Sequence, residues 1–299
     1  MPKTFIIILN WNGWFHTSKC IESLLKSDKI NHEIILVDNG STDQSVSKLN
    51  QAYPNITLIQ NSTNLGFAEG CNIALRYALS HGGDYFFLLN NDAIVAEDTL
   101  IMLLQKAEQK DSADIFAPFI YTLSEPLRIE SCGGKIYPMS GRIQHYIIFN
   151  QKKPLPKIDF LSGCALWVKR KVVEKIGYLE PRFFCYMEDV DWCIRARKAG
   201  FKLAVVPEAR VWHKQACATG GKSSPIRIYY CVRNHLLLLN KHYPIHPVFH
   251  LFRYFTVVMS YFAFILVYSD MPKKKALSYV IRGIMDYHQN QWGQLSHEI

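Results

Sequence analysis

The sequence predicts an α/β protein built on a Rossmann-like sheet, followed by a smaller helical extension at the C-terminus. In the first hundred residues, short apolar runs alternate with segments whose apolar residues recur at roughly helical spacing. Short apolar runs are typical of buried parallel strands, and the alternation indicates that helical crossovers join them. The expected strands cover residues 5–9, 33–37, 56–60 and 85–89, and the expected helices cover 17–27, 43–51 and 67–80.

The composition is that of a folded globular protein. The chain has 299 residues, of which 49% are hydrophobic and 20% charged, so it can bury a large core. These values exclude a disulfide-stabilised miniprotein and wholesale disorder. The eight cysteines include no CxxC pair, which argues against a zinc ribbon and indicates reduced, buried thiols. Near the N-terminus only residues 5–9 are continuously apolar, too few for a signal peptide, so we expect a cytoplasmic protein.

The pattern changes along the chain. From about residue 112 it is mixed, with strand-like segments at 115–121 and 203–206 and helical segments at 169–176 and 189–199. No repeat or low-complexity linker interrupts it. We therefore treat residues 1–243 as one domain and residues 244–299 as a C-terminal helical extension.

The extension is apolar and basic. Residues 254–268 carry no charge and are rich in aromatic side chains, and a lysine triplet follows at 273–275. As a helix these fifteen residues span about 22 Å, less than the roughly 30 Å of a bilayer's hydrocarbon core. The pattern favours peripheral attachment at the inner face of the cell membrane. A packed or homodimer-forming helix and a true membrane span are the alternatives.

The net charge of +9 is concentrated near the C-terminus. Residues 201–299 hold 12 Lys and Arg against 4 Asp and Glu, whereas the preceding residues are almost balanced. Such a segment can meet nucleic acid, anionic lipid or a phosphorylated substrate. Because the positive charge adjoins an uncharged aromatic stretch and no RNA-reading motif is present, we expect no nucleic acid as a partner.

Polar or small residues follow each of the four expected strands. Ligands of open α/β sheets lie at the carboxyl ends of the strands, so these residues mark the candidate site. Asp38, after the second strand, can accept hydrogen bonds from a pyrimidine or a ribose hydroxyl. The alternative is ordinary turn chemistry, in which Ser41 or Asp43 caps the next helix.

Six segments follow one another in the order and spacing of a known enzyme family. They are FIIILNWNG, EIILVDNGSTD, NLGFAEGCN, FFLLNND, EDVDWCIRARKAG and VWH. Together they resemble the inverting family 2 glycosyltransferases of the GT-A fold, in particular the rhamnosyltransferase-like branch. The resemblance covers about residues 4–240 and depends on the ordered set, because each motif alone is short. It implies a GT-A domain that binds a nucleoside-diphosphate sugar.

The resemblance also implies a set of donor-binding residues. The segment 64–72 leads into a helix whose N-terminal amides can face a phosphate or a ribose, although its glycines also suit a turn. Gly163 lies in a small-residue stretch that equally suits a close-packed strand, and Arg233 either holds a phosphate or pairs with an acidic core residue. Lys222 is expected in a loop, residues 214–225, over the diphosphate. The full set is Asn10, Asp38, Asn39, Asn64, Gly66, Asn72, Asn91, Asp92, Gly163, Lys222 and Arg233.

A divalent cation, Mn²⁺ or Mg²⁺, is the implied cofactor. Residues 90–92 stand where the family carries its DxD motif, and Asp92 supplies a hard oxygen ligand. Asn90 replaces the first acidic residue, which predicts weak metal binding. His213 matches a histidine that several relatives use as a further ligand. The alternatives are a structural histidine and an aspartate that caps a helix expected over residues 96–105.

The cluster Glu188, Asp189 and Asp191 is the candidate for the catalytic base. Inverting transfer is a single displacement, in which one carboxylate removes the proton of the attacking hydroxyl. The family motif gives this role to Asp189, with Glu188 beside it. Mutual repulsion of the carboxylates can raise one pKa toward neutrality. An acidic helix start that complements the helix dipole is the alternative.

These observations predict an inverting transferase that moves a sugar such as L-rhamnose from a UDP- or dTDP-activated donor. The expected acceptor is a hydroxyl of a cell-surface glycan or of a polyprenyl-linked glycan, as in polysaccharide biosynthesis. Two other functions are weighed: a sugar nucleotidyltransferase and a noncatalytic scaffold for glycan assembly. The first lacks its usual basic, glycine-rich loop after the first strand, and the second is expected to have lost Asp189.

Overall fold

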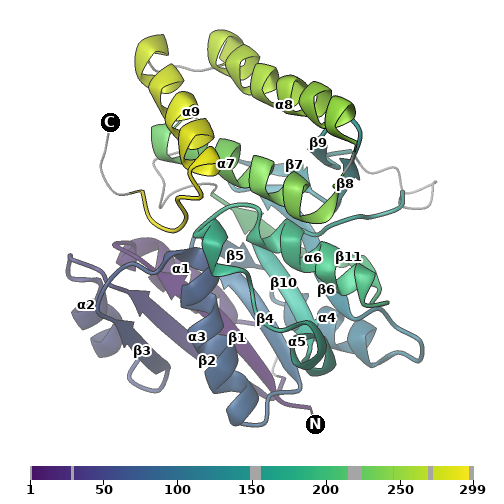
Figure 1. Ribbon diagram of the computed structural model, residues 1–299. Coiled ribbons are helices and arrows are strands. Elements are labelled where there is room, and N and C mark those ends of the chain that lie inside the picture. The colour runs from purple at the N-terminus through teal and green to yellow at the C-terminus, as the bar shows by residue number, and fades with distance from the viewer. Residues whose placement is uncertain are drawn as a thin grey trace.

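The computed structural model describes residues 2–27, 30–148, 156–214, 224–244, 246–268 and 272–295. Its centre is a nine-stranded mixed sheet with helices on both faces, and a group of three helices lies at one end of the molecule (Figure 1). Lys222 and most of the loop expected at 214–225 lie outside the described residues.

The first half of the sheet is parallel, as the sequence predicts. Its strands lie side by side in the order β3-β2-β1-β4. In register, Asn10 stands beside Asp38, and Asn39 stands beside Asn61. The polar residues that end these strands therefore meet at one edge. The strands are β1 (Thr4–Asn10), β2 (His32–Asn39), β3 (Thr57–Asn61) and β4 (Tyr85–Asn90).

The second half of the sheet mixes directions. Strand β10 (Ala165–Lys169) runs antiparallel between β4 and β6 (Ile115–Thr122), which joins the two halves. Strand β11 (Leu203–His213) pairs parallel with β6. The remaining strands are β5 (Ala93–Val95) beside β11, β7 (Glu125–Ser131) beside β6, and a separate hairpin of β8 (Gly134–Tyr137) and β9 (Arg142–His145).

Alternating side chains of each strand face two helical layers. On β1, Phe5 and Ile7 belong to one core cluster, whereas Ile6 and Ile8 belong to the other. The first cluster lies against α3 (Gly66–Ser80), α5 (Arg170–Ile176) and α6 (Glu188–Lys198), with the short helix η1 (Pro181–Phe183) nearby. The second lies against α1 (Trp14–Leu25), α2 (Ser45–Ala52) and α4 (Thr99–Glu108).

The helix expected to start at residue 96 begins later. Residues 93–95 pair with 211–213 of β11 and form β5, so Asp92 precedes a strand. Helix α4 begins at Thr99, with Asp98 as its N-cap residue. The interpretation of Asp92 as a helix cap is therefore wrong.

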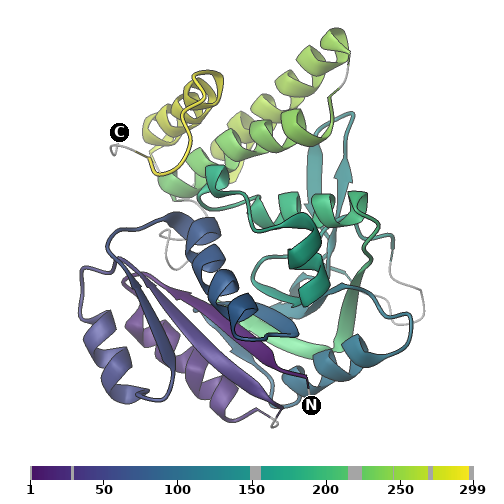
Figure 2. The same ribbon diagram turned by 60° about the horizontal axis from the view of Figure 1, so that its bottom comes forward.

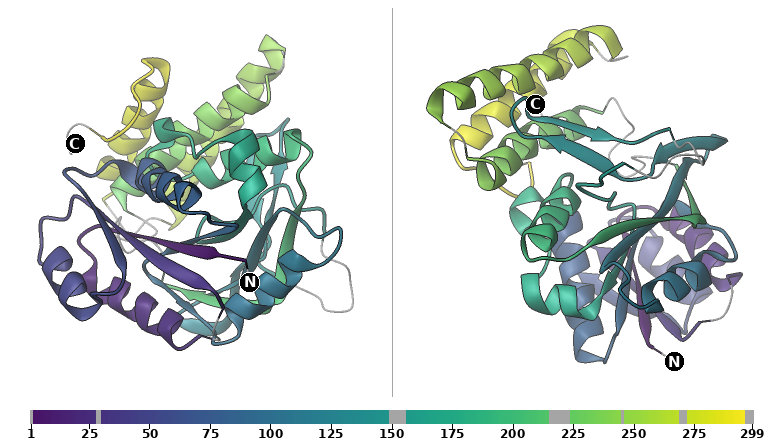
Figure 3. Two further views of the ribbon diagram at one scale, coloured as in Figure 1. Left: turned by 90° about the horizontal axis from the view of Figure 1, so that it is seen from below. Right: turned by 90° about the vertical axis from the view of Figure 1, so that its right-hand side faces the viewer.

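The C-terminal helices stack against the domain from one side. Helix α7 (Pro225–His242) contributes to the main core and also packs against α9 (Lys273–His288). Helix α8 (Pro247–Tyr268) lies outermost, away from the main sheet (Figures 2 and 3). By length and composition, α8 is the one described helix that could cross a membrane: the segment Pro247–Val267 has a mean hydropathy of 1.5 and is 17% buried.

Candidate active site

The ends of β1 and β2 are joined through a buried carboxylate. Asp38 Oδ1 accepts hydrogen bonds from Asn10 Nδ2 at 2.8 Å and from the Ser41 hydroxyl at 2.6 Å, and Asp38 Oδ2 accepts from the Ser41 amide at 2.9 Å. Asp38 is only 3% exposed. These bonds fix the loop after β2, where glycine is required at residue 40 because its φ is +73° and a Cβ would lie 2.5 Å from the Thr63 backbone.

Two asparagine side chains hold the N-terminus of α3 in place through hydrogen bonds. Asn39 Oδ1 accepts from Asn61 and from the Leu65 amide, while Asn39 Nδ2 donates to Asn64 Oδ1 at 2.9 Å and to the Gly66 carbonyl at 3.0 Å. Asn64 Oδ1 in turn accepts from the Gly66 amide at 2.9 Å. The segment expected to bind the donor is thus held rigidly against the end of β2.

His213 lies between two carboxylates. Its Nε2 is 3.0 Å from Asp92 Oδ1, and its Nδ1 is 3.1 Å from Glu130 Oε1. Burial lowers the pKa of His213, but the neighbouring Cys164, Asp92 and Glu130 outweigh burial and raise the pKa well above its usual range. Asn90 Nδ2 also lies 3.2 Å from His213 Nε2. Asp92 and His213, far apart in sequence, therefore form one pair.

A chain of hydrogen bonds connects Asn91, the residue before Asp92, to Asp38. Asn91 donates to the Thr17 hydroxyl at 3.0 Å, and Thr17 donates to Asn10 Oδ1 at 2.7 Å. Asn10 in turn donates to Asp38. Asn10, Asp38 and Asn91, expected at the donor site on separate strands, thus belong to one network.

The cluster at the start of α6 is connected to His213 through residues 163 and 164. Asp189 Oδ2 accepts a hydrogen bond from the Gly163 amide at 2.6 Å, and Asp189 Oδ1 accepts from the Val190 amide at 2.8 Å. The residue after Gly163 is Cys164, whose side chain interacts with His213. A Cβ at position 163 would lie 2.9 Å from Asp189 Cβ, so glycine permits this close approach.

The two neighbouring carboxyl groups differ in their surroundings. Glu188 is 5% exposed, and its Oε2 has no hydrogen-bond partner. Burial and the adjacent Asp189 raise the pKa of Glu188 well above its usual range, which favours its protonated form. Burial also raises the pKa of Asp189, but its two backbone donors and His145 oppose the rise.

Two residues expected to bind the donor have their polar atoms engaged elsewhere. Asn72 is 1% exposed and bonds both the amide and the carbonyl of Leu179. Arg233 is fully buried, and its five N–H groups point to the carbonyls of three residues and to the side chains of Asn234 and Tyr229. The expected phosphate contact of Arg233 does not fit this placement, because no N–H group is left for an anion.

Sequence reasoning missed Glu130, Thr17, His145 and Asn234. Glu130 and His145 lie in strands without a recognised motif, so their proximity to His213 and Asp189 arises from tertiary structure alone. Asn234 directly follows Arg233 in the sequence, and only Arg233 was expected in the site.

The sequence was compared with protein families and with curated proteins. Residues 5–177 match the family model for glycosyl transferase family 2. The chain belongs to this family. It is 26% identical over 245 residues to the N-acetylglucosaminyl-diphospho-decaprenol L-rhamnosyltransferase of Mycobacterium tuberculosis, covering 72% of this chain and 77% of that one. It is 25% identical to the dTDP-rhamnosyl transferase RfbF of Shigella flexneri, covering 80% of each chain.

The fold agrees with the family. The mannosyltransferase PcManGT from Pyrobaculum calidifontis, solved in complex with GDP-Man and Mn²⁺, superimposes with a TM-score of 0.60. The match covers 97% of this chain and 88% of that one at 14% sequence identity, which shows the shared fold alone. This family 2 glycosyltransferase therefore has a GT-A fold, as the sequence predicts.

The site of the glycosyltransferase suits a metal ion that would be coordinated partly by the protein and partly by the donor. The described residues contain no group of three His, Cys, Asp or Glu side chains arranged to hold an ion. Asp92 and His213 would supply two ligands once the imidazole has released the proton that it shares with Asp92, and Glu130 on Nδ1 orients the imidazole as carboxylates do beside metal-binding histidines. Mg²⁺ is commonly held by one or two carboxylates together with substrate phosphates, so few protein ligands are needed.

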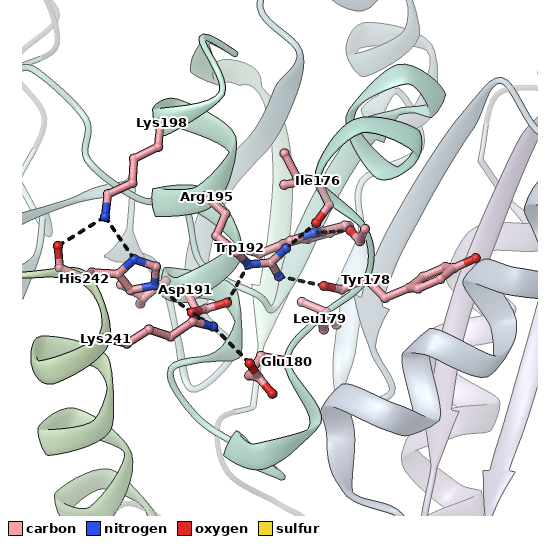
Figure 4. Close-up of polar contacts among 12 residues, drawn as sticks. Ile176, Tyr178, Leu179, Glu180, Asp191, Trp192, Arg195, Lys198, Lys241 and His242 are labelled. Atoms are coloured by element: carbon pink, nitrogen blue, oxygen red, sulfur yellow. Dashed lines mark hydrogen bonds and ion pairs between the residues drawn. The ribbon is translucent and has the colours of Figure 1, made fainter.

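A buried ion network anchors α6 in the glycosyltransferase (Figure 4). Asp191 is completely buried, and its carboxylate contacts Arg195 at 2.8 Å, Lys241 at 2.7 Å and His242 at 2.7 Å. Burial raises the pKa of Asp191, but the hydrogen bond from His242 and the charges of Arg195 and Lys241 hold the pKa well below its usual range. Lys241 also pairs with Glu180 at 3.0 Å. The network ties α6 to the end of α7.

We predict that Asp191→Asn destabilises the fold by about 3 kcal/mol at pH 7, because it leaves buried cations without their partner. The pKa of Asp191 is depressed in the folded state, so its contribution is present above the unfolded pKa of about 3.9 and declines below that pH. Urea unfolding between pH 7 and pH 3 measures the difference. Glu174→Gln, which breaks an exposed pair with Arg170, is the control and is expected to cost less than about 1 kcal/mol. An equal loss in both variants would contradict the prediction.

Proposed function

We propose that this glycosyltransferase moves a sugar, L-rhamnose in the favoured case, from a UDP- or dTDP-sugar to a hydroxyl of a cell-surface or polyprenyl-linked glycan, with inversion. The sugar and acceptor classes come from relatives named as rhamnosyltransferases, one of which acts on a diphospho-decaprenol substrate by name. The observation that carries the mechanism is the position of Asp189. Its carboxylate accepts a hydrogen bond from the Gly163 amide, and the next residue, Cys164, interacts with His213.

Asp189 acts as the general base in this proposal. It takes the proton of the attacking hydroxyl as the new bond to the anomeric carbon forms, and the bond from that carbon to the diphosphate breaks with its electron pair leaving on the phosphate oxygen. The Gly163 and Val190 amides hold the two carboxylate oxygens in place during the transfer. The raised pKa of Asp189 makes its ionised form a stronger base than an exposed aspartate.

Glu188 keeps the local charge low. With Glu188 protonated and the charge of Asp191 compensated by Arg195 and Lys241, Asp189 is the carboxylate at the start of α6 whose negative charge has no cationic partner among those described. A second negative charge there would repel both the base and the departing diphosphate. The neutral Glu188 therefore supports a site that must accept and release a multiply charged anion.

Asp92 and His213 would hold Mn²⁺ or Mg²⁺, the ion that such a reaction would need at the departing diphosphate. When bound, the ion would neutralise the negative charge that develops on the diphosphate. Glu130 fixes the imidazole so that Nε2 faces Asp92. Asn90, a neutral amide in the first position of the motif, lies beside His213 and adds no charge to the pair.

The outer face of α8 suits attachment to an anionic membrane. Large apolar side chains on α8 are more than 40% exposed, while Val257 and Ile265 on its other face are buried against α7 and α9. The lysine triplet 273–275 opens α9 near the end of α8, where Lys273 Nζ donates to the Ile265 carbonyl at 2.8 Å, and it can attract acidic headgroups. A helix that packs on one side and exposes apolar residues on the other lies in the interface. The exposed set is Val248, Phe249, Leu251, Phe252, Phe255, Met259, Leu266 and Val267.

For the base, we predict that Asp189→Asn lowers kcat by at least ~100-fold while the dissociation constant of the donor stays nearly constant, because general-base contributions are about 10² to 10⁴. Donor binding is measured by calorimetry and transfer by release of nucleoside diphosphate. Asp111→Asn is the matched control, since Asp111 is exposed and has a φ of 57°, which asparagine adopts readily. Normal turnover of Asp189→Asn would refute the mechanism.

For the metal, we predict that EDTA abolishes transfer and that Mn²⁺ or Mg²⁺ restores it. His213→Ala should raise the Mn²⁺ concentration needed for half-maximal activity by about 10-fold or more, because it removes one of two protein ligands. His81→Ala, on the exposed end of α3, is the control. Full activity in the chelator would instead assign charge neutralisation to basic groups such as Lys222.

For the membrane, we predict that the full-length protein sediments with phosphatidylglycerol vesicles and that the double substitution of Phe252 and Phe255 by Asn weakens this binding by at least ~10-fold. Each of the two rings is 60% exposed, so their loss removes apolar contact with the bilayer without opening the core. Leu127→Asn, at a residue 95% exposed on β7, is the control. Undiminished binding of the double variant would reject α8 as the attachment surface, and resistance to alkaline extraction would indicate a membrane span.

A further inference from the structure

The backbone just before the proposed base adopts an unfavourable conformation. Phe184, Tyr186 and Met187 have φ values of 63°, 68° and 74°, a left-handed region that non-glycine residues rarely occupy. The next two residues are Glu188 and Asp189. The direction in which Asp189 enters the site therefore depends on whatever holds this turn, residues 184–187, in place.

The side chain of Asn234 on α7 contacts three backbone carbonyl oxygens in and beside the turn. Its Nδ2 lies 2.8 Å from the carbonyl oxygen of Phe183, 2.7 Å from that of Cys185 and 2.8 Å from that of Tyr186. Asn234 is fully buried, so water cannot replace these bonds. The two N–H groups of one amide are thereby shared among three backbone carbonyls of residues 183, 185 and 186.

Arg233 extends this contact toward the preceding residues and the C-terminal segment. Its Nη2 donates to the carbonyls of Arg182 at 3.2 Å and Phe183 at 3.1 Å, and its Nη1 donates to the carbonyl of Gly293 at 2.9 Å. The guanidinium also lies 5.0 Å from the centre of the Tyr230 ring. Arg233 is fully buried and pairs with no carboxylate in the described part of the chain, so its hydrogen bonds define its role.

The opposite side of the turn contacts the donor segment. The Phe184 carbonyl accepts a hydrogen bond from the Ala68 amide at 3.1 Å in the first turn of α3. The Phe184 ring stacks on Tyr230, with centres 5.2 Å apart. A Cβ on Gly66, whose φ is +80°, would lie 2.5 Å from the Phe184 carbonyl oxygen. The turn is thus enclosed between α3 and α7.

We propose that Asn234 and Arg233 are positioning residues that clamp the turn 184–187 and thereby aim Asp189 at the acceptor hydroxyl. They touch neither donor nor acceptor, and they act through the backbone that carries the base. The proposal rests on the function proposed above for Asp189. It replaces the phosphate contact that the sequence suggested for Arg233.

The test compares Asn234→Ala with Val232→Ala. Val232 is also fully buried on α7, but it packs between α7, α8 and α9 and not against the turn, so it controls for general destabilisation. In Asn234→Ala, amide hydrogen exchange in residues 183–191 should become at least ~10-fold faster, and kcat should fall by at least ~10-fold, because a base displaced by about 1 Å costs up to 10²-fold. The KM for the donor should change by less than about 3-fold. Val232→Ala should show neither effect.

Exchange at 183–191 that stays as slow as in the unmodified protein would overturn the clamp, and faster exchange with unchanged kcat would overturn the positioning role. If Asn234→Ala does not fold, Arg233→Lys takes its place, since it keeps the charge but loses the planar group of five donors. The exchange measurement needs no substrate. If the unmodified protein transferred no sugar, the proposed function would fail, whereas the clamp would still be decided by exchange.

Discussion

The structure gathers acidic groups around a site whose substrate is itself a multiply charged anion, and everything else in the site depends on how their charge is controlled. Each carboxyl group meets a different environment. Asp38 accepts hydrogen bonds from Asn10 and Ser41, and Asp92 faces His213. Burial raises the pKa of Glu188 and favours its neutral form, and Asp189 is held by two backbone amides. Asp191, in the same helical turn, is compensated by Arg195 and Lys241, so its charge adds little to the charge of Asp189, where the proposed reaction needs a base.

The parallel half of the site could be predicted from the sequence because its geometry is local. Alternating strands and helices fix a common direction for β1, β2 and β4, so the polar residues at their ends must meet at one edge. The register of Asn10 beside Asp38 follows from this rule. The prediction that a helix starts soon after Asp92 was wrong for a non-local reason. Residues 93–95 pair with β11, which lies more than a hundred residues further along the chain. This pairing outweighed the local apolar pattern.

The other half of the site could not be read from the sequence, because its contacts join residues distant along the chain. Gly163 and Asp189 are 26 residues apart, and Glu130 and His213 are 83 residues apart. Motifs indicated Asp189 and His213 but gave no reason to expect their partners. For Arg233 the sequence left two roles open, a phosphate contact and an ion pair with an acidic core residue, whereas its burial and its contacts with backbone carbonyls favour a structural role.

Helix α7 connects the base to the apolar C-terminal helices. One side of it bonds to the turn before Asp189 through Asn234, and another side meets α8, where the Tyr261 hydroxyl donates to the Cys231 carbonyl at 3.1 Å. The turn and α8 are therefore separated by the width of a single helix, about 10 Å. If α8 lies in the membrane interface as proposed, an acceptor sugar on a lipid diphosphate would need to rise only about this far from the headgroups to meet Asp189. A short reach of this kind would suit an enzyme in which the apolar helix packs on one side of α7 and the turn before the base packs on another.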